Sequence, residues 1–353
     1  MEFYEILDRV FAGDEVHIRD IVQLLEAAGL EQAALFAAAD TVRRAAVGDG
    51  VHLRALVEIS NHCIRNCLYC GLRRDNSAIA RYRMTAEEVV DAALAAVRMG
   101  YGSVVLQSGD DPLFTTDQLA DIIRRIKAET EAAITLSIGE RPRSAFAQLK
   151  EAGADRFLMR HETADSKLYA RLHPGDTLAG RLQHIHILRD LGYQVGAGMM
   201  VGLPGQTLES LAQDIILLKE IAADMVGIGP FIANPQTPLA GEPSGALSLT
   251  LNTLAVTRLV VRHIHMPSTT ALGTIHPAGR RLGLLAGANV IMPVFTPGSY
   301  TKLYNLYPNK ASLGQAPQDR EDTIRRLVHS IGRHIAQGPG HSVRLSGTLR
   351  REG

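Results

Sequence analysis

The segment Asn61-His62-Cys63-Ile64-Arg65-Asn66-Cys67-Leu68-Tyr69-Cys70 contains all three cysteines of the 353-residue chain. Their spacing is C-x3-C-x2-C, and a predicted strand, Leu53–Ile59, comes directly before them. An odd number of clustered cysteines is not typical of a disulfide framework. Three thiols in one loop instead indicate a metal or cluster site in a reducing compartment.

Short strand-like runs and amphipathic helical patterns alternate on both sides of this segment. The predicted strands are Leu53–Ile59, Ser103–Gln107, Ala133–Ile138, Arg156–Met159, Gln194–Val201, Met225–Ile228, Met266–Thr269 and Asn289–Met292. The helices between them have start signals such as the capping boxes Thr85/Glu88 and Thr115/Gln118. Eight such units over roughly 240 residues predict an α/β fold, a complete (β/α)8 TIM-type barrel. An open doubly wound sheet of the same content is the alternative.

Two further regions flank the predicted barrel, which is expected over residues 51–310. Residues 1–50 predict an N-terminal helical extension that packs on the barrel, because Phe3–Phe11, Ile18–Ala28 and Glu31–Ala46 have helical apolar spacing. Residues 311–353 are expected to form a C-terminal helix and a tail. The tail after about Gly338 is expected to be loose and solvated.

The charge balance and the hydropathy narrow the classes of partner. Lys plus Arg and Asp plus Glu both number 37, so the formal net charge is zero. A general nucleic-acid-binding protein would show a basic excess, so no nucleic-acid partner is expected. No run of about 18 apolar residues occurs, so no membrane span is expected. The stretch MEFYEILDRVFAGDE is acidic and amphipathic rather than a basic signal peptide, so we expect a cytoplasmic protein.

The cysteine segment follows the first predicted strand, so it should lie at the carboxyl end of the barrel, where such folds carry their active sites. A [4Fe–4S] cluster is usually held by four thiolates. Three thiolates therefore leave one iron open for another ligand. A zinc site completed by His62 or another histidine is the alternative, although no Cys-x2-Cys pair occurs elsewhere in the sequence.

This segment resembles the radical S-adenosylmethionine (SAM) superfamily, whose hallmark is C-x3-C-x2-C with an aromatic residue, here Tyr69, before the last cysteine. The resemblance implies a [4Fe–4S] cluster on Cys63, Cys67 and Cys70, with SAM bound at the open iron. It also implies reductive cleavage of SAM to a 5′-deoxyadenosyl radical. The electron would come from a low-potential donor of the ferredoxin or flavodoxin type.

Further segments are similar to the HydE family, the radical SAM maturases of [FeFe]-hydrogenase. They include ITLSIGERPR, GADRFLMRHETAD, GLPGQT, DMVGIGPFI, TTALGTIHPAGR and GANVIMP. The resemblance implies a role in assembling the hydrogenase diiron subcluster together with the HydG and HydF maturases. The implied substrate is a cysteine-bound Fe(CO)2CN synthon from HydG. Some family members hold a second cluster on extra C-terminal cysteines, which this sequence lacks.

The resemblance also implies two sets of site residues, and the residue chemistry supports several of them. The set implied for the SAM pocket is Tyr69, Gln107, Ser108, Glu162, Arg181 and Met200. The set implied for the catalytic inner cavity is Arg54, Thr135, Ser137, Arg160, Met225, Thr269, Thr270 and Tyr304. Arg181 could pair with the SAM carboxylate bidentately. Thr135 and Ser137 are two apart and share one strand face.

The arginines among these candidates indicate the charge of the substrate. An arginine inside a barrel is costly unless it is paired with an anion, so Arg54 and Arg160 suit a carboxylate-bearing substrate. Pairing of Arg54 with an internal acid such as Glu58 is the alternative. The turn Gln107-Ser108-Gly109-Asp110-Asp111 occupies the place of a superfamily motif that contacts the SAM amino group. It reads Ser-Gly-Asp-Asp where relatives often have Ser-Gly-Glu-Asp.

Four other functions compete with this interpretation, and one of them is a metal-independent barrel lyase, which would hold no iron. Methylornithine synthase, PylB, is a related lysine mutase, and an amino acid would suit the same arginines. Biotin synthase is less favoured because it needs further cysteines for a sacrificial cluster. A non-catalytic iron–sulfur scaffold or carrier would share the cluster but would not cleave SAM.

Overall fold

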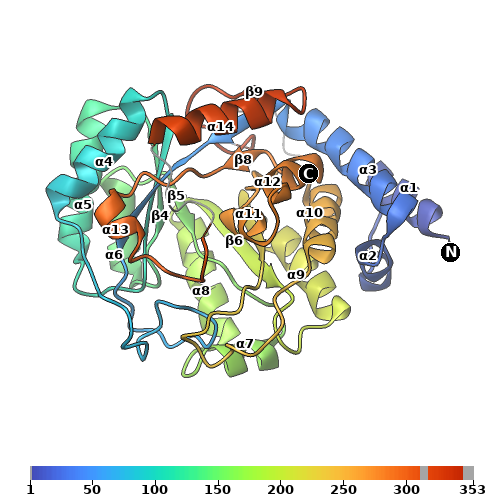
Figure 1. The fold of residues 1–353 in the computed structure, drawn as a ribbon, viewed down its shortest axis with the longest axis horizontal. Coiled ribbons are helices and arrows are strands. Elements are labelled where there is room, and N and C mark those ends of the chain that lie inside the picture. Colours follow the sequence, from blue (N-terminus) through green and yellow to red (C-terminus); the bar gives the residue numbers. More distant parts are fainter. Residues whose placement is uncertain (1, 311–316, 345–353) are drawn as a thin grey trace.

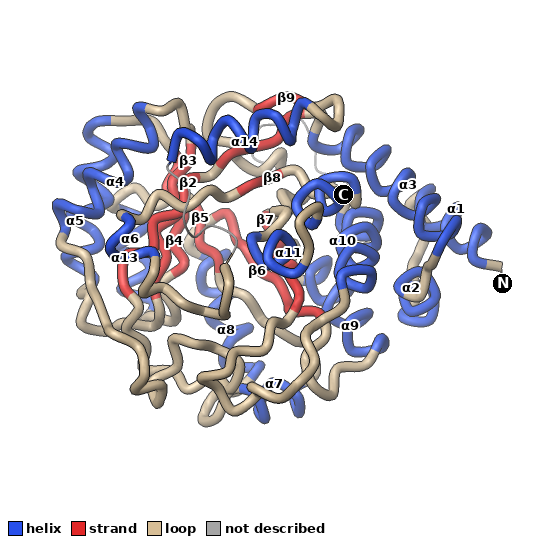
Figure 2. The backbone as a smooth tube through the Cα atoms, viewed as in Figure 1, coloured by secondary structure: helices blue, strands red, loops and turns tan. Residues whose placement is uncertain are grey.

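A parallel sheet of six strands stands at the centre of the structure, and helices surround it (Figures 1 and 2). The computed structural model describes residues 2–310 and 317–344. The strands, in spatial order, are β2 (Ala55–Ser60), β3 (Ser103–Ser108), β4 (Ala133–Ser137), β5 (Arg156–Leu158), β6 (Gln194–Val201) and β7 (Met225–Pro230). Because neighbouring strands pair in parallel, the chain must cross over between them, and helices form these crossovers.

A second sheet contains β1 (Gly50–Leu53) between β8 (Val290–Ile291) and β9 (His334–Ile335). The predicted strand Leu53–Ile59 therefore divides at Arg54, and its two parts pair in different sheets. Single parallel bridges lie between the two sheets, joining Met225 to His265, Pro267 to Val290 and Leu56 to Val294. The observed fold is thus an α/β fold with a parallel sheet, in which single bridges lead from β7 towards β8 and back to β2.

The predicted strand Met266–Thr269 is wrong, because no regular strand forms there in the described part of the chain. Two of its residues have other roles. Pro267 has no N–H to donate to a ladder. The Thr269 hydroxyl accepts a hydrogen bond from Leu272 N at 3.4 Å and caps the next helix. The last predicted strand, Asn289–Met292, is present but is limited to β8.

The helices of the crossovers and the outer layer follow most of the predicted patterns. They are α4 (Ala86–Arg98), α5 (Thr116–Glu129), α6 (Arg143–Glu151), α7 (Ser166–Leu172), α8 (Leu178–Asp190), α9 (Leu208–Glu220), α10 (Leu247–Val261), α11 (Thr270–Ile275), α12 (Gly279–Leu285), α13 (Gly298–Thr301) and α14 (Pro317–His329). The capping boxes at Thr85 and Thr115 are confirmed, since each hydroxyl accepts a backbone N–H at 3.3 Å.

Three N-terminal helices, α1 (Phe3–Ala12), α2 (Ile18–Leu25) and α3 (Gly29–Val47), lie together at one side of the molecule (Figure 1). They pack on α9 and α10, where the Asn252 amide donates to the carbonyl oxygens of Leu25 and Ala27 at 2.8 and 2.9 Å. No single described helix is long and apolar enough to cross a membrane. Taken together, however, α2 and α3 reach the required length and hydropathy as a pair bent by 117°.

The two faces of the sheet differ in chemistry. On β4, Ile134 and Leu136 belong to the main apolar core between strands and helices. Leu56, Val105 and Val294 form a separate small cluster on the opposite, inner face. Because side chains alternate along a strand, Thr135 and Ser137 of β4 lie on this inner face.

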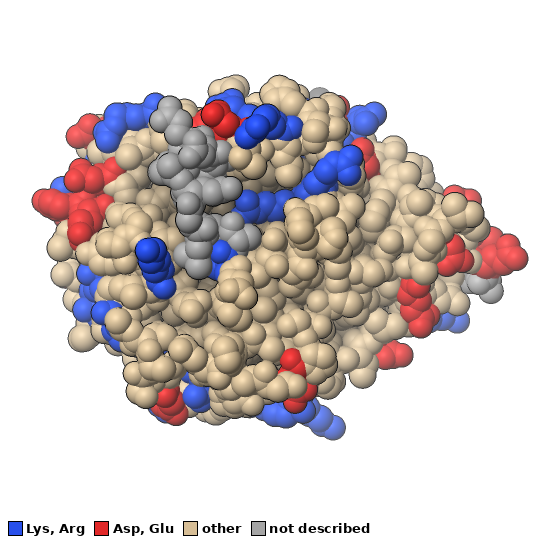
Figure 3. All heavy atoms as spheres, viewed as in Figure 1, with Lys and Arg blue, Asp and Glu red and all other residues tan. Residues whose placement is uncertain are grey.

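Charged side chains of both signs are interspersed on the face seen in Figure 3. Acidic side chains gather over the N-terminal helices at the right of that view, and basic ones occur near α14 at the top. Lys and Arg side chains there stand singly or in small groups.

The C-terminal segment packs against the amino ends of the strands. The expectation of a loose tail after Gly338 is therefore wrong for residues 339–342. The carbonyl oxygens of Pro339 and Gly340 accept hydrogen bonds from Arg156 and Arg54. Ser342 is 1% exposed and donates to Asp224 Oδ1 at 2.7 Å. The remainder of the expected tail, residues 345–353, lies outside the described residues, as do residues 311–316.

We predict that Ser342→Ala lowers the free energy of unfolding by about 1–3 kcal/mol, because a buried hydrogen bond to a carboxylate is lost. Urea unfolding of the purified protein measures this change. The matched control is Ser330→Ala, which removes an exposed hydroxyl bonded to Leu327 O at 2.7 Å and should change stability by less than about 0.5 kcal/mol. Equal effects of the two substitutions would contradict the packed position of the C-terminal segment.

Candidate active site

The three cysteines lie in the long loop between β2 and α4, at the carboxyl end of the sheet. Each is a free thiol of intermediate exposure. The Arg81 guanidinium holds this loop, because it donates to four of its carbonyl oxygens at 2.6–3.1 Å. These acceptors belong to Asn61, Leu72, Arg73 and Asn76. The acceptors stand on both sides of the cysteines in sequence, so Arg81 fixes the ends of the cysteine segment.

The turn after β3 packs directly against the cysteine segment. The Asp110 N–H donates to Cys63 Sγ at 3.4 Å, and the Ile64 N–H donates to Asp110 O at 2.9 Å. A Cβ atom at Gly109 would overlap the His62 carbonyl oxygen, so only glycine permits this close approach. The turn predicted to bind SAM is therefore also part of the cysteine site.

The surroundings of the three cysteines raise the pKa of their thiols. Desolvation raises the pKa of Cys67 to about 12, and the neighbouring Cys63 raises it further in the same direction. Desolvation likewise raises the pKa of Cys63 and of Cys70. Ionised thiolates at this place need a compensating positive charge, which bound iron supplies.

These cysteines fit a cubane cluster better than a single ion. The three thiols are close enough to influence one another's pKa. Yet no three His, Cys, Asp or Glu side chains in the described ranges are placed to hold one metal ion. A [4Fe–4S] cluster binds each thiolate at a different iron, so its ligands stand further apart than those of one zinc ion.

The Tyr69 hydroxyl contacts His173 Nε2 at 2.8 Å, and the two rings meet edge to face at 5.4 Å. His173 also stacks on Tyr169 at 4.1 Å, and burial lowers the pKa of His173, so its ring is neutral at pH 7. The Tyr169 hydroxyl accepts a hydrogen bond from Arg181 Nε at 3.1 Å. Two of the predicted SAM-pocket residues, Tyr69 and Arg181, are thus joined through two aromatic residues that sequence reasoning missed.

Glu162 has a φ angle of 66°, in the left-handed region that is unfavourable for a residue with a side chain. Its backbone is held on both sides by β6: its N–H donates to Gly198 O at 2.9 Å, and its carbonyl accepts from Met200 N at 3.2 Å. Its carboxylate lies 3.0 Å from Arg160 Nη2. Such strain is typical of functional sites, and here it brings Glu162, Arg160 and Met200 together at the end of the sheet.

The acidic turn after β3 uses its carboxylates within the protein. Asp110 pairs with Arg65 at 2.7 Å. Asp111 accepts from Nε and Nη2 of Arg83, each at 2.8 Å, and from Ser60 Oγ at 2.7 Å. Burial alone would raise the pKa of Asp111, but the bonds from Arg83 and Ser60 lower it below its usual value. The candidates left to face a ligand in this turn are Gln107 and Ser108.

Gln107 and Ser108 themselves lie at the carboxyl end of β3. Gln107 Nε2 donates to the Tyr304 hydroxyl at 3.2 Å, which places these two predicted site residues together. The Ser108 hydroxyl donates to Gly109 O at 2.6 Å.

The inner-cavity candidates divide between the two ends of the sheet. Five of them lie at or beyond the carboxyl ends of the strands: Ser137, Arg160, Thr269, Thr270 and Tyr304. Thr269 Oγ1 is 3.1 Å from where a Cβ of Gly229 would stand, so Thr269 borders β7. Thr135 is 2% exposed, and its hydroxyl has no hydrogen-bond partner within the described part of the chain.

Arg54 and Met225 lie at the amino end instead. Arg54 precedes β2, and its guanidinium contacts Met225 Sδ at 2.7 Å and Gly340 O at 3.2 Å. The alternative in which Arg54 pairs with Glu58 is wrong, because the carboxylate of Glu58 accepts from Lys310 instead. Burial lowers the pKa of Arg54, and the positive charge of the nearby Arg156 lowers it further.

Sequence reasoning missed residues that connect the loops of this site. They are Arg65, Arg81, Glu140, Tyr169, His173 and Lys310. Arg65 lies between two of the cysteines, and Glu140 lies in the quoted segment ITLSIGERPR, so their positions were a usable signal. The others lie outside the quoted motifs, although Tyr169 and His173 closely follow the segment GADRFLMRHETAD.

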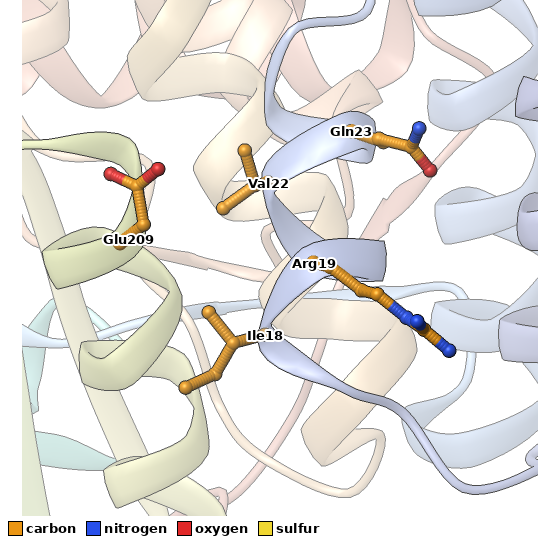
Figure 4. Close-up of a pocket in the computed structure, with 5 residues that line it drawn as sticks. All are labelled: Ile18, Arg19, Val22, Gln23 and Glu209. Atoms are coloured by element: carbon orange, nitrogen blue, oxygen red, sulfur yellow. The ribbon is translucent and has the colours of Figure 1, made fainter.

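A surface pocket lies elsewhere, on the outside of the helical layer between α2 and α9 (Figure 4). Ile18 and Val22 of α2 face Glu209 across it, while Arg19 and Gln23 point away. None of the predicted site residues lines it.

Comparison with known proteins agrees with the cysteine site. A family model described as the radical SAM superfamily matches residues 57–218. The chain is 48% identical over 316 residues to the [FeFe] hydrogenase maturase subunit HydE of Thermotoga maritima, with 90% of each chain covered. The chain belongs to the HydE family of radical SAM proteins. As a member of the HydE family it is a radical SAM enzyme, and its cofactors are a [4Fe–4S] cluster and SAM.

More distant relatives of this HydE-family chain share its fold. It is 28% identical to the 3-methylornithine synthase of Methanosarcina barkeri, with 92% of each chain covered. The crystal structure of methylornithine synthase (PylB) superposes with a TM-score of 0.84 at 26% identity, covering 94% of this chain and 97% of that one. The radical SAM α/β fold is therefore shared over nearly the whole length.

We predict that Cys67→Ala lowers the iron content of the anaerobically reconstituted protein from about four atoms per chain to below about one. Iron analysis and the absorbance of the cluster measure this loss, because each thiolate holds a different iron. Ile64→Ala, at an exposed position of the same segment, is the control and should retain its iron. Full iron loading of the Cys67 variant would show that the cluster is held elsewhere.

Proposed function

We propose that this protein acts in assembly of the diiron subcluster of [FeFe]-hydrogenase, using SAM cleavage. The observation that carries the proposal is the 48% identity, over 90% of both chains, to a HydE maturase subunit. The three cysteines of the C-x3-C-x2-C segment, with none elsewhere in the chain, support the use of one cluster.

We also infer a complete (β/α)8 barrel over residues 51–310, between an N-terminal helical extension (1–50) and a C-terminal helix and tail (311–353). The single bridges at His265, Pro267 and Val294 support closure, because they would lead the six-stranded sheet back from β7 to β2. We further propose a cytoplasmic location, which suits free thiols that must stay reduced.

In this proposal Cys63, Cys67 and Cys70 hold the cluster, and the SAM pocket is formed by Tyr69, Gln107, Ser108, Glu162, Arg181 and Met200. The reduced cluster, when bound, supplies the electron that cleaves SAM to methionine and a 5′-deoxyadenosyl radical. Arg181 would bind the SAM carboxylate, because its side chain stays charged: Tyr169 and Glu140 raise its pKa although burial alone would lower it. Glu162 would accept hydrogen bonds from the SAM ammonium or ribose.

The proposed substrate is a cysteine-bound Fe(CO)2CN synthon supplied by HydG, with HydF as a further partner in assembly. Arg160 Nη2 already pairs with Glu162, but its Nε atom is buried without a hydrogen-bond partner in the described chain and would be free to donate to an anionic substrate. The inward hydroxyls of Thr135 and Ser137, with Thr269, Thr270 and Tyr304, would position it. Arg54 and Met225 would limit the cavity at its amino end. A low-potential ferredoxin or flavodoxin would donate the electron.

Omission of this protein from an anaerobic maturation system tests the proposal. We expect hydrogenase activity to fall to the level of a system without any maturase, and activity to return when the purified protein is added. The reduced protein should also cleave SAM, which a scaffold or carrier would not do. Undiminished hydrogenase activity without the protein would contradict the proposed role.

A methylornithine synthase is the second candidate, because the superposition on PylB covers 94% of the chain. Incubation of the reconstituted enzyme with lysine and SAM distinguishes the two functions. Formation of 3-methylornithine would favour the lysine mutase, whereas SAM cleavage without this product favours the maturase.

We predict that Thr135→Val lowers the activity without lowering the stability of the protein. The substitution removes a buried hydroxyl without a hydrogen-bond partner in the described chain, so the free energy of unfolding should stay equal or rise by about 1 kcal/mol. Loss of a hydrogen bond to the substrate should lower kcat/KM about tenfold. Thr257→Val in α10 is the control, since its hydroxyl is also buried and without a partner there but lies in the helical layer. Equal activities of the two variants would remove Thr135 from the substrate site.

A further inference from the structure

One carboxylate, that of Glu140, joins the cysteine segment to Arg181. Glu140 follows β4, and its Oε2 accepts from Arg65 Nη2 at 2.8 Å. Its Oε1 lies 3.2 Å from Arg181 Nε. Arg65 stands between the first two cysteines, while Arg181 lies in the first turn of α8. Glu140 therefore binds two guanidinium groups that come from distant parts of the chain.

A second contact of Arg181 leads back to the cysteine segment. Arg181 Nε donates to the Tyr169 hydroxyl at 3.1 Å, and Tyr169 stacks on His173. His173 Nε2 contacts the Tyr69 hydroxyl at 2.8 Å. Arg65 and Tyr69 both belong to the cysteine segment, so these contacts form a closed circuit that begins and ends there. Arg181 connects the route through Glu140 with the route through Tyr169 and His173.

The terminal nitrogens of Arg181 take no part in the contacts of this circuit, so they can bind a ligand. The hydrogen bond and the ion pair that Arg181 makes with other described residues both use its Nε atom. The side chains of Glu140 and Arg181 are only 12% and 13% exposed, so their attraction is weakly screened. A guanidinium fixed at Nε presents its terminal nitrogens in one orientation, which is the arrangement that bidentate binding of a carboxylate requires.

Arg65 carries two further carboxylates, Asp110 at 2.7 Å and Asp176. Asp110 belongs to the turn whose N–H contacts Cys63 Sγ. Glu140 thus adds one negative charge to a network that directly borders a cysteine. A negative charge near the cluster disfavours the added electron and lowers the reduction potential.

We propose that Glu140 is a positioning residue, which orients Arg181 towards the carboxylate of SAM and ties that orientation to the cysteine segment through Arg65. The inference rests on the proposed function, because it assumes that SAM binds at Arg181. It assigns to Glu140 a role in SAM affinity and in cluster potential, without contact between Glu140 and SAM.

The test compares Glu140→Gln with the wild type as the full-length, anaerobically reconstituted protein. A neutral amide keeps the shape but loses the charge that holds both arginines, so SAM should bind about tenfold more weakly. SAM affinity is measured through the change that SAM causes in the spectrum of the reduced cluster. The midpoint potential, measured by redox titration, should rise, while the iron content stays the same.

Glu87→Gln is the matched control, because Glu87 pairs with Arg125 at 2.8 Å on the exposed surface of α4 and should change neither SAM affinity nor potential. Glu140→Asp retains the charge and should keep most of the SAM affinity of the wild type. This variant carries the test if the Gln variant loses its cluster. Wild-type SAM affinity and potential in the Gln variant would overturn the inference and leave the proposed function intact. Failure of the wild type itself to bind SAM would overturn the proposed function, and the inference with it.

Discussion

The loop between β2 and α4 must hold three thiols in a fixed arrangement although it has neither helix nor strand from Asn61 to Tyr82. One guanidinium, that of Arg81, satisfies four carbonyl oxygens of this loop. These backbone groups cannot pair with a ladder, and leaving them buried without a donor would cost about 1–3 kcal/mol each. The cysteines, and the turns that pack on them, depend on this set of bonds.

The same end of the sheet is organised by ion pairs between loops rather than by apolar packing. Asp110, Glu140 and Asp176 come from three different loops and meet at Arg65. Because the carboxyl ends of parallel strands converge, residues distant in sequence can share one guanidinium there. The result is a polar framework in which the loops that hold the cluster are connected to those proposed to hold SAM.

The sequence predicted local features more reliably than contacts between loops. The cysteine spacing, the capping boxes and β6 could be recognised because each depends on a few neighbouring residues. The strand expected at Met266–Thr269 failed because Pro267 has no N–H for a ladder and forms only a single bridge, while Thr269 caps the next helix. The pairs that Arg65 makes with Glu140 and Asp176 span 75 and 111 residues, and no local pattern marks them.

The first and last strands of the described chain pair with each other, and this has a consequence for biosynthesis. Arg54 and Gly340 are separated by 286 residues, yet the guanidinium of one binds the carbonyl of the other. During translation β1 emerges from the ribosome long before β9. One edge of β1 and the Arg54 guanidinium therefore stay unpaired until the end of the chain has been made. The central strands can pair as they are made, whereas the amino end of the sheet is completed last.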